Sequence, residues 1–287
     1  MKSLKDYQGN VISAAEAMAL IERLPRPKKT EPKNPEPPSR VSFSEGDFLT
    51  LENISCVDAE GNIFERYDRL DVARDIFRSG NAQVDRTPYN HAVHCEKNGL
   101  FLPSFALTCN IVARLYERRA DAEIKRVLQQ YKNKGNGDGW HAQNTIVRWV
   151  DNAGEILHYP SDGDFPSHGG REQVNKNAGK TSFPFSRQGF NNTSLEQALT
   201  LPNYKTFVQN LTGLEDPRIL VKIGEYFSKP TQIWVPTNWN GTTSAWFGCY
   251  DASFLLNANY YLNLAYSARG VRRRSGERSE PDAGGAK

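Results

Sequence analysis

The sequence predicts an α+β fold: a single globular body with antiparallel hairpins and several helices, flanked by flexible N- and C-terminal segments. Three observations lead to this prediction. Two runs of alternating apolar and polar residues are each interrupted by a turn that ends in glycine, which is typical of a β-hairpin. Several other runs place apolar residues every three or four positions, as amphipathic helices do. Strands and helices do not alternate regularly, so the strands are expected to pair mostly as antiparallel hairpins.

The composition is that of an ordinary folded protein. A chain of 287 residues with 38% hydrophobic and 24% charged residues suits one globular domain, or at most two small ones. No run approaches eighteen consecutive apolar residues, so we expect no membrane contact through a spanning helix. The N-terminus lacks the pattern of a secretory signal. Four cysteines without a CxxC pair predict reduced thiols in a cytoplasmic, intracellular compartment.

Four parts are predicted along the chain: an N-terminal helix segment (1–24), a proline-rich linker (25–40), a globular α+β domain (41–268) and a basic disordered tail (269–287). Ser13 and Glu16 form a capping box that predicts a helix over 13–24.

The linker is predicted from composition, because six prolines fall between residues 25 and 40 among charged residues. A helix on such a linker is an arm that docks either on its own body or on a second copy. The second case would make the protein a homo-oligomer.

The first half of the globular domain is predicted to contain a hairpin and two helices. Residues 48–67 alternate in polarity and predict a hairpin that turns at 58–61. Residues 69–79 predict a helix. Residues 81–100 show little regular pattern. Residues 104–119 are apolar almost all round, which predicts a buried central helix.

The second half is predicted to begin with a helix over 121–133 and a hairpin over 142–159 that turns at 151–154. Short helices and one strand are then expected at 194–200, 203–211, 215–228 and 231–235. The last element is predicted to be a helix over 251–268, because seven apolar or aromatic residues from Phe254 to Tyr266 fall on one helical stripe.

Charge is distributed unevenly along the chain. Residues 1–40 contain eight basic and five acidic residues, residues 269–287 contain six and three, and residues 41–268 contain 22 and 25. The ends are therefore expected to lead any attraction to an anionic partner such as nucleic acid. The arginines expected to contact that partner are Arg269, Arg272, Arg273, Arg274 and Arg278.

A long aperiodic loop over 158–188 is the first candidate site, since such loops inside a compact body are commonly functional. Two imidazoles and two carboxylates there suit Zn²⁺ or Mn²⁺ and indicate a metal-dependent phosphoester hydrolase; they are His158, Asp162, Asp164 and His168. Ordinary turn chemistry is the alternative.

The same loop contains residues suited to a phosphate. Gly179, Lys180 and Thr181 imitate the end of a P-loop, but Val174 stands where that motif needs glycine. The remaining prediction is a phosphate cradle of backbone amides and positive charge, formed by Gly169, Gly170, Arg171 and Lys180.

A second set of metal-ligating residue types is formed by His91, His94 and Cys95. A complete site would need a fourth ligand from elsewhere. Histidines that make ordinary hydrogen bonds are the alternative.

Cys249 is a candidate nucleophile, because it precedes the expected start of the last helix at Asp251, where the helix dipole would lower the pKa of a thiol. The run Gly248-Cys-Tyr-Asp-Ala-Ser-Phe resembles the start of the central helix of papain-like cysteine hydrolases. Every histidine precedes this cysteine, so the resemblance implies a permuted arrangement with His141 or His158 as the base. A buried core cysteine is the alternative.

Aromatic residues are concentrated late in the chain. Trp239 and Trp246, interleaved with polar residues between 234 and 250, are expected to line a ligand site by stacking. A packed aromatic core explains the same residues.

Three functions remain open. The first is a non-enzymatic binding or assembly protein whose flexible basic ends contact an anionic partner. The alternatives are the metal-dependent hydrolase of the 158–168 loop and the permuted cysteine hydrolase of Cys249. The first is preferred because it requires no unobserved arrangement of residues.

Overall fold

The computed structural model describes residues 4–5, 11–12, 44–79, 82–83, 87–132, 140–150, 153–159, 180–184, 193–235, 241–250, 253–260 and 268–273. The chain divides into two units, residues 1–40 and residues 41–287. In the first unit, strands β1 (Leu4–Lys5) and β2 (Val11–Ile12) pair antiparallel. The helix predicted over 13–24 and the linker predicted over 25–40 lie outside the described residues.

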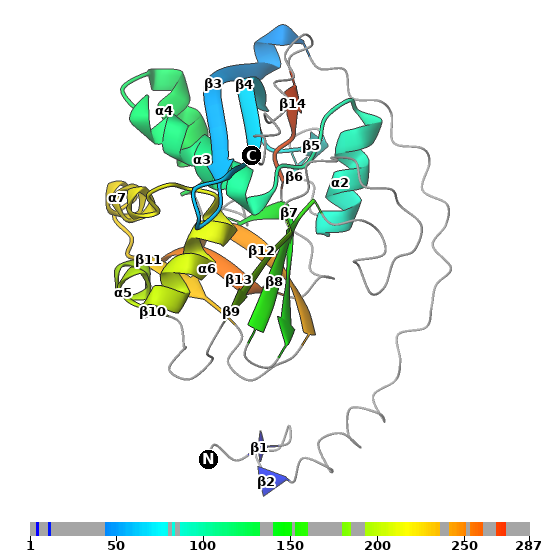
Figure 1. The fold of residues 1–287 in the computed structure, drawn as a ribbon. Coiled ribbons are helices and arrows are strands. Elements are labelled where there is room, and N and C mark those ends of the chain that lie inside the picture. Colours follow the sequence, from blue (N-terminus) through cyan, green and yellow to red (C-terminus); the bar gives the residue numbers. More distant parts are fainter. Residues whose placement is uncertain are drawn as a thin grey trace, which may run out of the picture. The chain divides into compact units, whose positions relative to one another are not determined.

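The second unit combines helices with antiparallel and mixed sheets, so the predicted α+β class is confirmed (Figure 1). A larger sheet has the strand order β10-β11-β13-β12-β7-β8-β9, and a smaller sheet has the order β14-β4-β3. The strands of the larger sheet are β7 (Trp140–Val150), β8 (Ala153–His158), β9 (Lys180–Pro184), β10 (Thr193–Ser194), β11 (Thr231–Trp234), β12 (Gly241–Tyr250) and β13 (Ser253–Tyr260). Those of the smaller sheet are β3 (Phe48–Val57), which follows the short 3-10 helix η1 (Glu45–Asp47), then β4 (Ile63–Ala73) and β14 (Val271–Arg273).

Both predicted hairpins are present. The strands β3 and β4 pair antiparallel, as do β7 and β8. Neighbours in the larger sheet are antiparallel with one exception among the described strands, the parallel pair β11 and β13.

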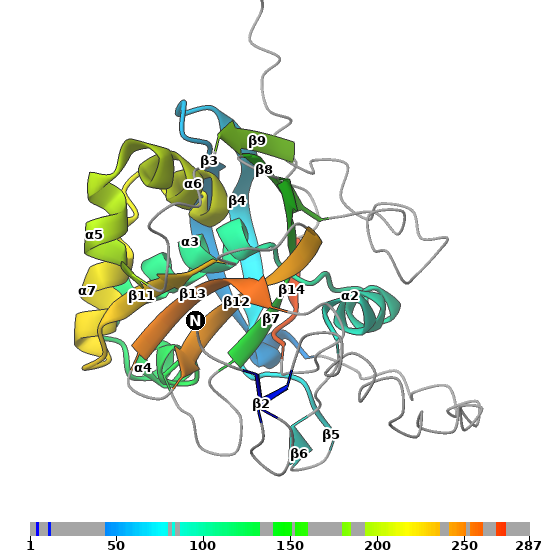
Figure 2. The ribbon, with the colours of Figure 1, turned by 90° about the horizontal axis from the view of Figure 1, so that it is seen from below.

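Helix α3 (Phe105–Glu117) is the central helix that the sequence predicts. Ser104 caps it by accepting a hydrogen bond from the Leu107 amide at 3.0 Å. Nine of its thirteen residues are buried, because it packs on β3 of the smaller sheet and on β7 and β12 of the larger one. Figure 2 shows α3 between the two sheets. The four residues that are not fully buried are Asn110, Arg114, Tyr116 and Glu117.

The other helices surround this core. Helices α5 (Leu195–Thr200), α6 (Pro202–Thr212) and α7 (Arg218–Tyr226) lie together on one side, and α2 (Pro88–Lys97) lies on the other (Figures 1 and 2). Helix α4 (Ala122–Gln129) begins after Asp121, whose carboxylate accepts from two amides of the first turn. The structure therefore contains four further helices and one strand that the sequence predicts, the helices at 121–133, 194–200, 203–211 and 215–228 and the strand at 231–235. No helix in the described part of the chain is long and apolar enough to span a membrane.

Two predictions for residues 69–100 are wrong. The helix predicted over 69–79 is the second half of β4 followed by a short strand pair, β5 (Arg78–Ser79) and β6 (Ala82–Gln83). Pairing with β3 on one side and β14 on the other favours the extended chain there. The segment 81–100, read as irregular, contains α2, whose start has a Thr87 cap and Pro88 in the first turn, both ordinary helix signals.

The helix predicted over 251–268 is also wrong for the described residues, because 253–260 form β13. This strand lies between β11 and β12 inside the larger sheet. Residues 254–258 are consecutively buried, since both faces of the strand are covered. Consecutive apolar residues in such a strand imitate a helical stripe.

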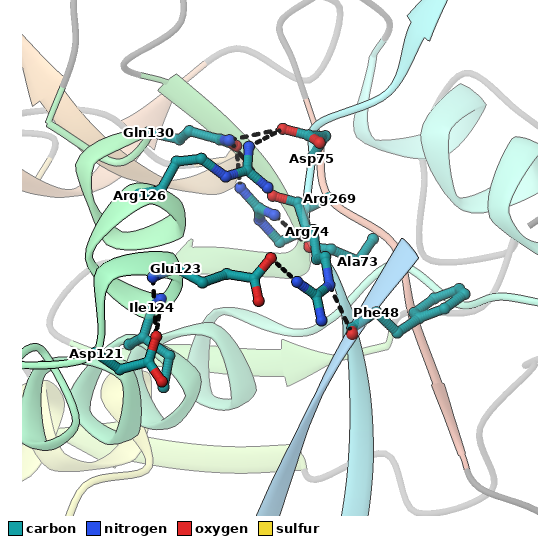
Figure 3. A network of polar contacts seen from close by, with 10 residues as sticks. All are labelled: Phe48, Ala73, Arg74, Asp75, Asp121, Glu123, Ile124, Arg126, Gln130 and Arg269. Carbon is teal, nitrogen blue, oxygen red and sulfur yellow. Dashed lines mark hydrogen bonds and ion pairs between the residues drawn. The ribbon is translucent and has the colours of Figure 1, made fainter. Parts of the chain in front are cut away.

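The disordered tail predicted over 269–287 is contradicted at its start. Residues 271–273 form β14, which pairs antiparallel with β4. The Arg269 guanidinium is buried, donates hydrogen bonds to the Ala73 carbonyl and the Gln130 side chain, and lies 5.4 Å from the Tyr131 ring centre. Figure 3 shows Arg269 pointing into the polar network between β4 and α4. The body therefore continues at least to Arg273.

Candidate functional site

The structure places His158 in the apolar interior, at the end of β8. Its ring stacks on Phe64 at 5.2 Å between ring centres. Nε2 lies 3.1 Å from the Asn210 carbonyl, which can only accept, so this nitrogen carries the proton. Nδ1 then accepts from the Thr145 hydroxyl at 2.9 Å, and that hydroxyl accepts from the Phe105 amide. Both ring nitrogens are thus engaged within the core.

Burial lowers the pKa of His158 to about 4, so the imidazole is neutral at physiological pH. The other predicted metal ligands, Asp162, Asp164 and His168, lie outside the described residues. So do Gly169, Gly170 and Arg171 of the predicted phosphate cradle, whereas Lys180 begins β9 and pairs with Leu157.

His91, His94 and Cys95 all belong to α2. Phe77 stacks on His91 at 5.8 Å and meets the His94 ring edge-on at 4.9 Å. Among the residues that the structure describes, no group of three or more histidine, cysteine, aspartate or glutamate side chains is placed to hold a metal ion.

Cys249 does not stand before a helix. It lies in β12 opposite Phe254 of β13, and its side chain is fully buried. Burial raises the pKa of the Cys249 thiol to about 12, so the thiol is protonated at neutral pH. The physical reason for expecting a nucleophile there, a helix beginning at Asp251, is therefore removed.

His141, the other base considered for Cys249, is also a core residue. Its pKa is lowered to about 3, chiefly by burial and then by the nearby Arg269 charge. Trp246 is fully buried and belongs to a hydrophobic cluster that also contains Leu255, so it packs in the core instead of lining an open ligand site. Trp239 lies outside the described residues.

The arginines predicted to bind nucleic acid divide into two groups. Arg269 is buried, and Arg272 bonds Asp71 at 3.0 Å and Glu45 at 2.9 Å while its guanidinium lies 3.9 Å from the Phe48 ring centre. These two side chains hold β14 on the body. The prediction that they belong to a flexible tail is therefore wrong. Arg273 pairs with Leu70 in the β14–β4 ladder, and Arg274 and Arg278 lie outside the described residues.

An open groove that the sequence did not indicate runs along β3. It has a volume of about 800 Å³, and a second hollow of about 460 Å³ continues it, because Arg114 and Glu117 line both. Its floor is β3, one wall is α3, and the other wall is formed by lining residues between 214 and 222, which include the first half of α7. We call this feature the β3 groove.

The floor of the β3 groove is the edge of the smaller sheet, since β4 is the only described strand that pairs with β3. Asn53 interrupts the ladder with φ 54°, a left-handed conformation that asparagine tolerates better than most residues. Among the described residues, the free edge has few main-chain partners. Outside the ladder, the Val57 amide donates to the Gly213 carbonyl at 2.9 Å.

The α3 wall presents one face of the helix, because Asn110, Ala113, Arg114 and Glu117 follow helical spacing. Asn110 fixes the inner end of the groove: its amide donates at 3.0 Å to the Gly213 carbonyl and to the Ala106 carbonyl. This end is tightly packed.

The two basic residues of this wall reach the strand edge. Arg114 donates to the Asn53 carbonyl at 3.1 Å, and Arg118 donates to the Thr50 carbonyl at 3.5 Å. The carbonyls of the β3 edge are thus covered by long side chains, not by another strand.

The charges that line the β3 groove balance. The basic residues are Arg114, Arg118, Arg218 and Lys222, and the acidic residues are Glu52, Glu117, Glu215 and Asp216. Arg114 pairs with Glu117 at 2.9 Å and Arg218 with Asp216 at 2.7 Å. The hydrogen bond from Arg218 is the main cause that lowers the pKa of Asp216. The described lining therefore provides a strand edge with hydrogen-bonding groups and charges of both signs.

Comparison with protein-family models, with curated proteins and with solved structures finds no match to this chain.

Proposed function

We propose that this protein is a non-enzymatic binding or assembly protein whose basic N-terminal segment, residues 1–40, contacts an anionic partner such as nucleic acid. The observation that supports this is the charge balance once β14 is counted with the body. Residues 41–273 contain 25 basic and 25 acidic residues, and residues 274–287 contain three of each. The net charge of +3 therefore belongs to residues 1–40.

The surroundings of the candidate catalytic groups favour binding over catalysis. Of those within the described residues, His158 is held by two hydrogen bonds in the core and Cys249 is a protonated thiol. Neither has the exposed position or the tuned pKa that a base or nucleophile needs.

The assembly part of the proposal concerns the predicted helix over 13–24 as an arm for a second copy. Leu20→Asp replaces one of its large apolar side chains by a charged one and is expected to lower the molecular mass measured by sedimentation if the arm joins two copies. We also propose a reducing intracellular compartment for the protein, a proposal supported by four free, buried cysteines.

The experiment for the anionic partner measures the affinity of the full chain for a mixed-sequence DNA oligonucleotide over a range of salt concentrations. The triple variant Lys28→Gln, Lys29→Gln, Lys33→Gln removes three positive charges from the N-terminal segment. The matched control Arg274→Gln, Arg278→Gln, Lys287→Gln removes three from the other end.

The N-terminal variant is expected to bind more weakly and to flatten the slope of log affinity against log salt by up to about 2.7, since each phosphate contact contributes about 0.9. The control is expected to change the slope much less. Equal effects of the two variants, or no DNA binding by the unmodified chain, would contradict the proposal.

A further inference from the structure

Beyond the anionic contact of residues 1–40, we infer that the β3 groove is a second, independent binding site, which takes an extended polypeptide strand with acidic side chains at its ends. The partner is defined by its backbone and by its charge. Both features follow from the edge of β3 and from the two walls beside it.

The shape of the β3 groove suits one extended strand. Residues that line its floor run from Thr50 to Val57, which corresponds to about 26 Å at 3.3 Å per residue. Past the kink at Asn53, Ser55 and Val57 follow at strand spacing along the same groove. A free sheet edge is a template for an added strand, and main-chain hydrogen bonds supply most of the affinity in that mode of recognition.

Two arginine side chains cover the edge of β3, and an incoming strand can displace them. The Thr50 and Asn53 carbonyls accept from Arg118 and Arg114, whose donors lie where the amides of an added strand would lie. The Arg114 side chain is 45% exposed, so it can turn to solvent without leaving a buried charge. The far end is closed by backbone, since the Val57 amide bonds to Gly213, and the added strand would stop there.

The charges of the β3 groove favour acidic residues at the ends of the bound strand. Arg114–Glu117 and Arg218–Asp216 neutralise each other within the groove. Glu52 pairs with Arg69 outside the groove at 3.9 Å, so two cations, Arg118 and Lys222, and one anion, Glu215, are left without an ion-pair partner among the described residues. Arg118 lines the part beside Thr50–Glu52, and Lys222 lines the part beside Asn53–Val57. One acidic side chain near each end of a strand would meet one of these cations.

A groove whose charges sum to zero does not suit a nucleic acid, which attracts a surplus of positive charge. A polypeptide has backbone amides and carbonyls that can pair with those of a strand edge, and a phosphodiester chain lacks them. The observations therefore favour the peptide.

The test uses the full chain and a blocked eight-residue peptide of alternating valine and threonine with glutamate at both ends, labelled for fluorescence anisotropy. Two further peptides serve as probes: one with lysine at both ends, and one with glutamate ends but with all its backbone amides N-methylated. The protein variant is Arg118→Glu with Lys222→Glu. Its matched control is Lys125→Glu with Lys205→Glu, which makes the same charge change on α4 and α6 outside the groove lining.

The glutamate-ended peptide is expected to bind and to slow hydrogen exchange of the β3 amides at 50–55. The Arg118→Glu, Lys222→Glu variant should weaken it about tenfold and should bind the lysine-ended peptide better than the unmodified chain does, whereas the control should do neither. N-methylation should abolish binding, because it removes the donors of the added strand.

The inference is overturned if the glutamate-ended peptide does not bind at about 1 mM, the weak end of useful affinities. Equal binding of the N-methylated peptide, equal effects of the two protein variants, or displacement of the peptide by a DNA oligonucleotide would also overturn it. Peptide binding should survive the Lys28, Lys29 and Lys33 substitutions, so this site and the N-terminal contact fail or succeed separately.

Discussion

Replacing Arg269 by methionine tests whether residues 268–273 belong to the folded body. The buried guanidinium donates to the Ala73 carbonyl and to Gln130, and methionine keeps the packing against Tyr131 while removing both donors. Ala73 is 3% exposed, so its carbonyl loses a donor that water cannot readily replace, which costs about 1–3 kcal/mol.

Two features reduce that cost. Removing Arg269 also removes a charge that had to be desolvated, and its Nε already lacks a hydrogen-bond partner among the described residues. We therefore expect a loss of about 2 kcal/mol in the free energy of unfolding. For a body of this size that corresponds to a fall in melting temperature of about 4–8 °C.

The assay is calorimetry and urea unfolding of the full chain, with Arg278→Met as the control that makes the same chemical change outside the described residues. The control should lie within about 0.5 kcal/mol of the unmodified protein. If the two variants unfold at the same temperature and urea concentration, Arg269 is not part of the core and the assignment of β14 to the body is refuted.

Three further predictions concern the interior. The pKa of His158 falls from 6.5 in the unfolded chain to about 4 in the fold, so only the unfolded state gains a proton as pH falls through this window. The contribution of His158 to the free energy of unfolding should be complete above pH 6.5 and fall by about 2 kcal/mol between pH 7 and 5, and His158→Gln should remove this part of the drop that urea midpoints measure. Cys249 should resist iodoacetamide at pH 7 until the protein is unfolded, and native labelling read by peptide mass spectrometry would contradict the burial described. Gly213→Ala should lower the melting temperature of the protein more than Gly99→Ala does. Both glycines have positive φ, but only at Gly213 would the new Cβ lie 2.7 Å from the Ala106 Cβ. Equal losses would show that the close packing at Gly213 is not there.

Local signals identified much of the fold from sequence. The helices predicted to begin near 104, 121 and 194 are present, and the structure shows that Ser104, Asp121 and Ser194 cap them with hydrogen bonds inside the first turn. Helix α2 could have been found in the same way from Thr87 and Pro88.

Long-range pairing explains what the sequence could not show. The second half of β4, β13 and β14 are extended because distant strands pair with them, and nothing within each segment states this. The candidate site was missed for the same reason. The β3 groove is built from three segments, and residues such as Asn53, Arg114 and Lys222 have no shared pattern in the chain.

The pairing of β14 with β4 has a consequence for synthesis on the ribosome. Arg272 bonds to Asp71, a residue 201 positions earlier in the chain. At roughly 5–20 residues per second, β4 waits about 10–40 s for this neighbour after it has been translated. During that interval its edge beside Leu70 and Val72, two fully buried residues in the finished body, is open to other chains. The nascent protein would therefore depend on chaperone cover until β14 has left the exit tunnel.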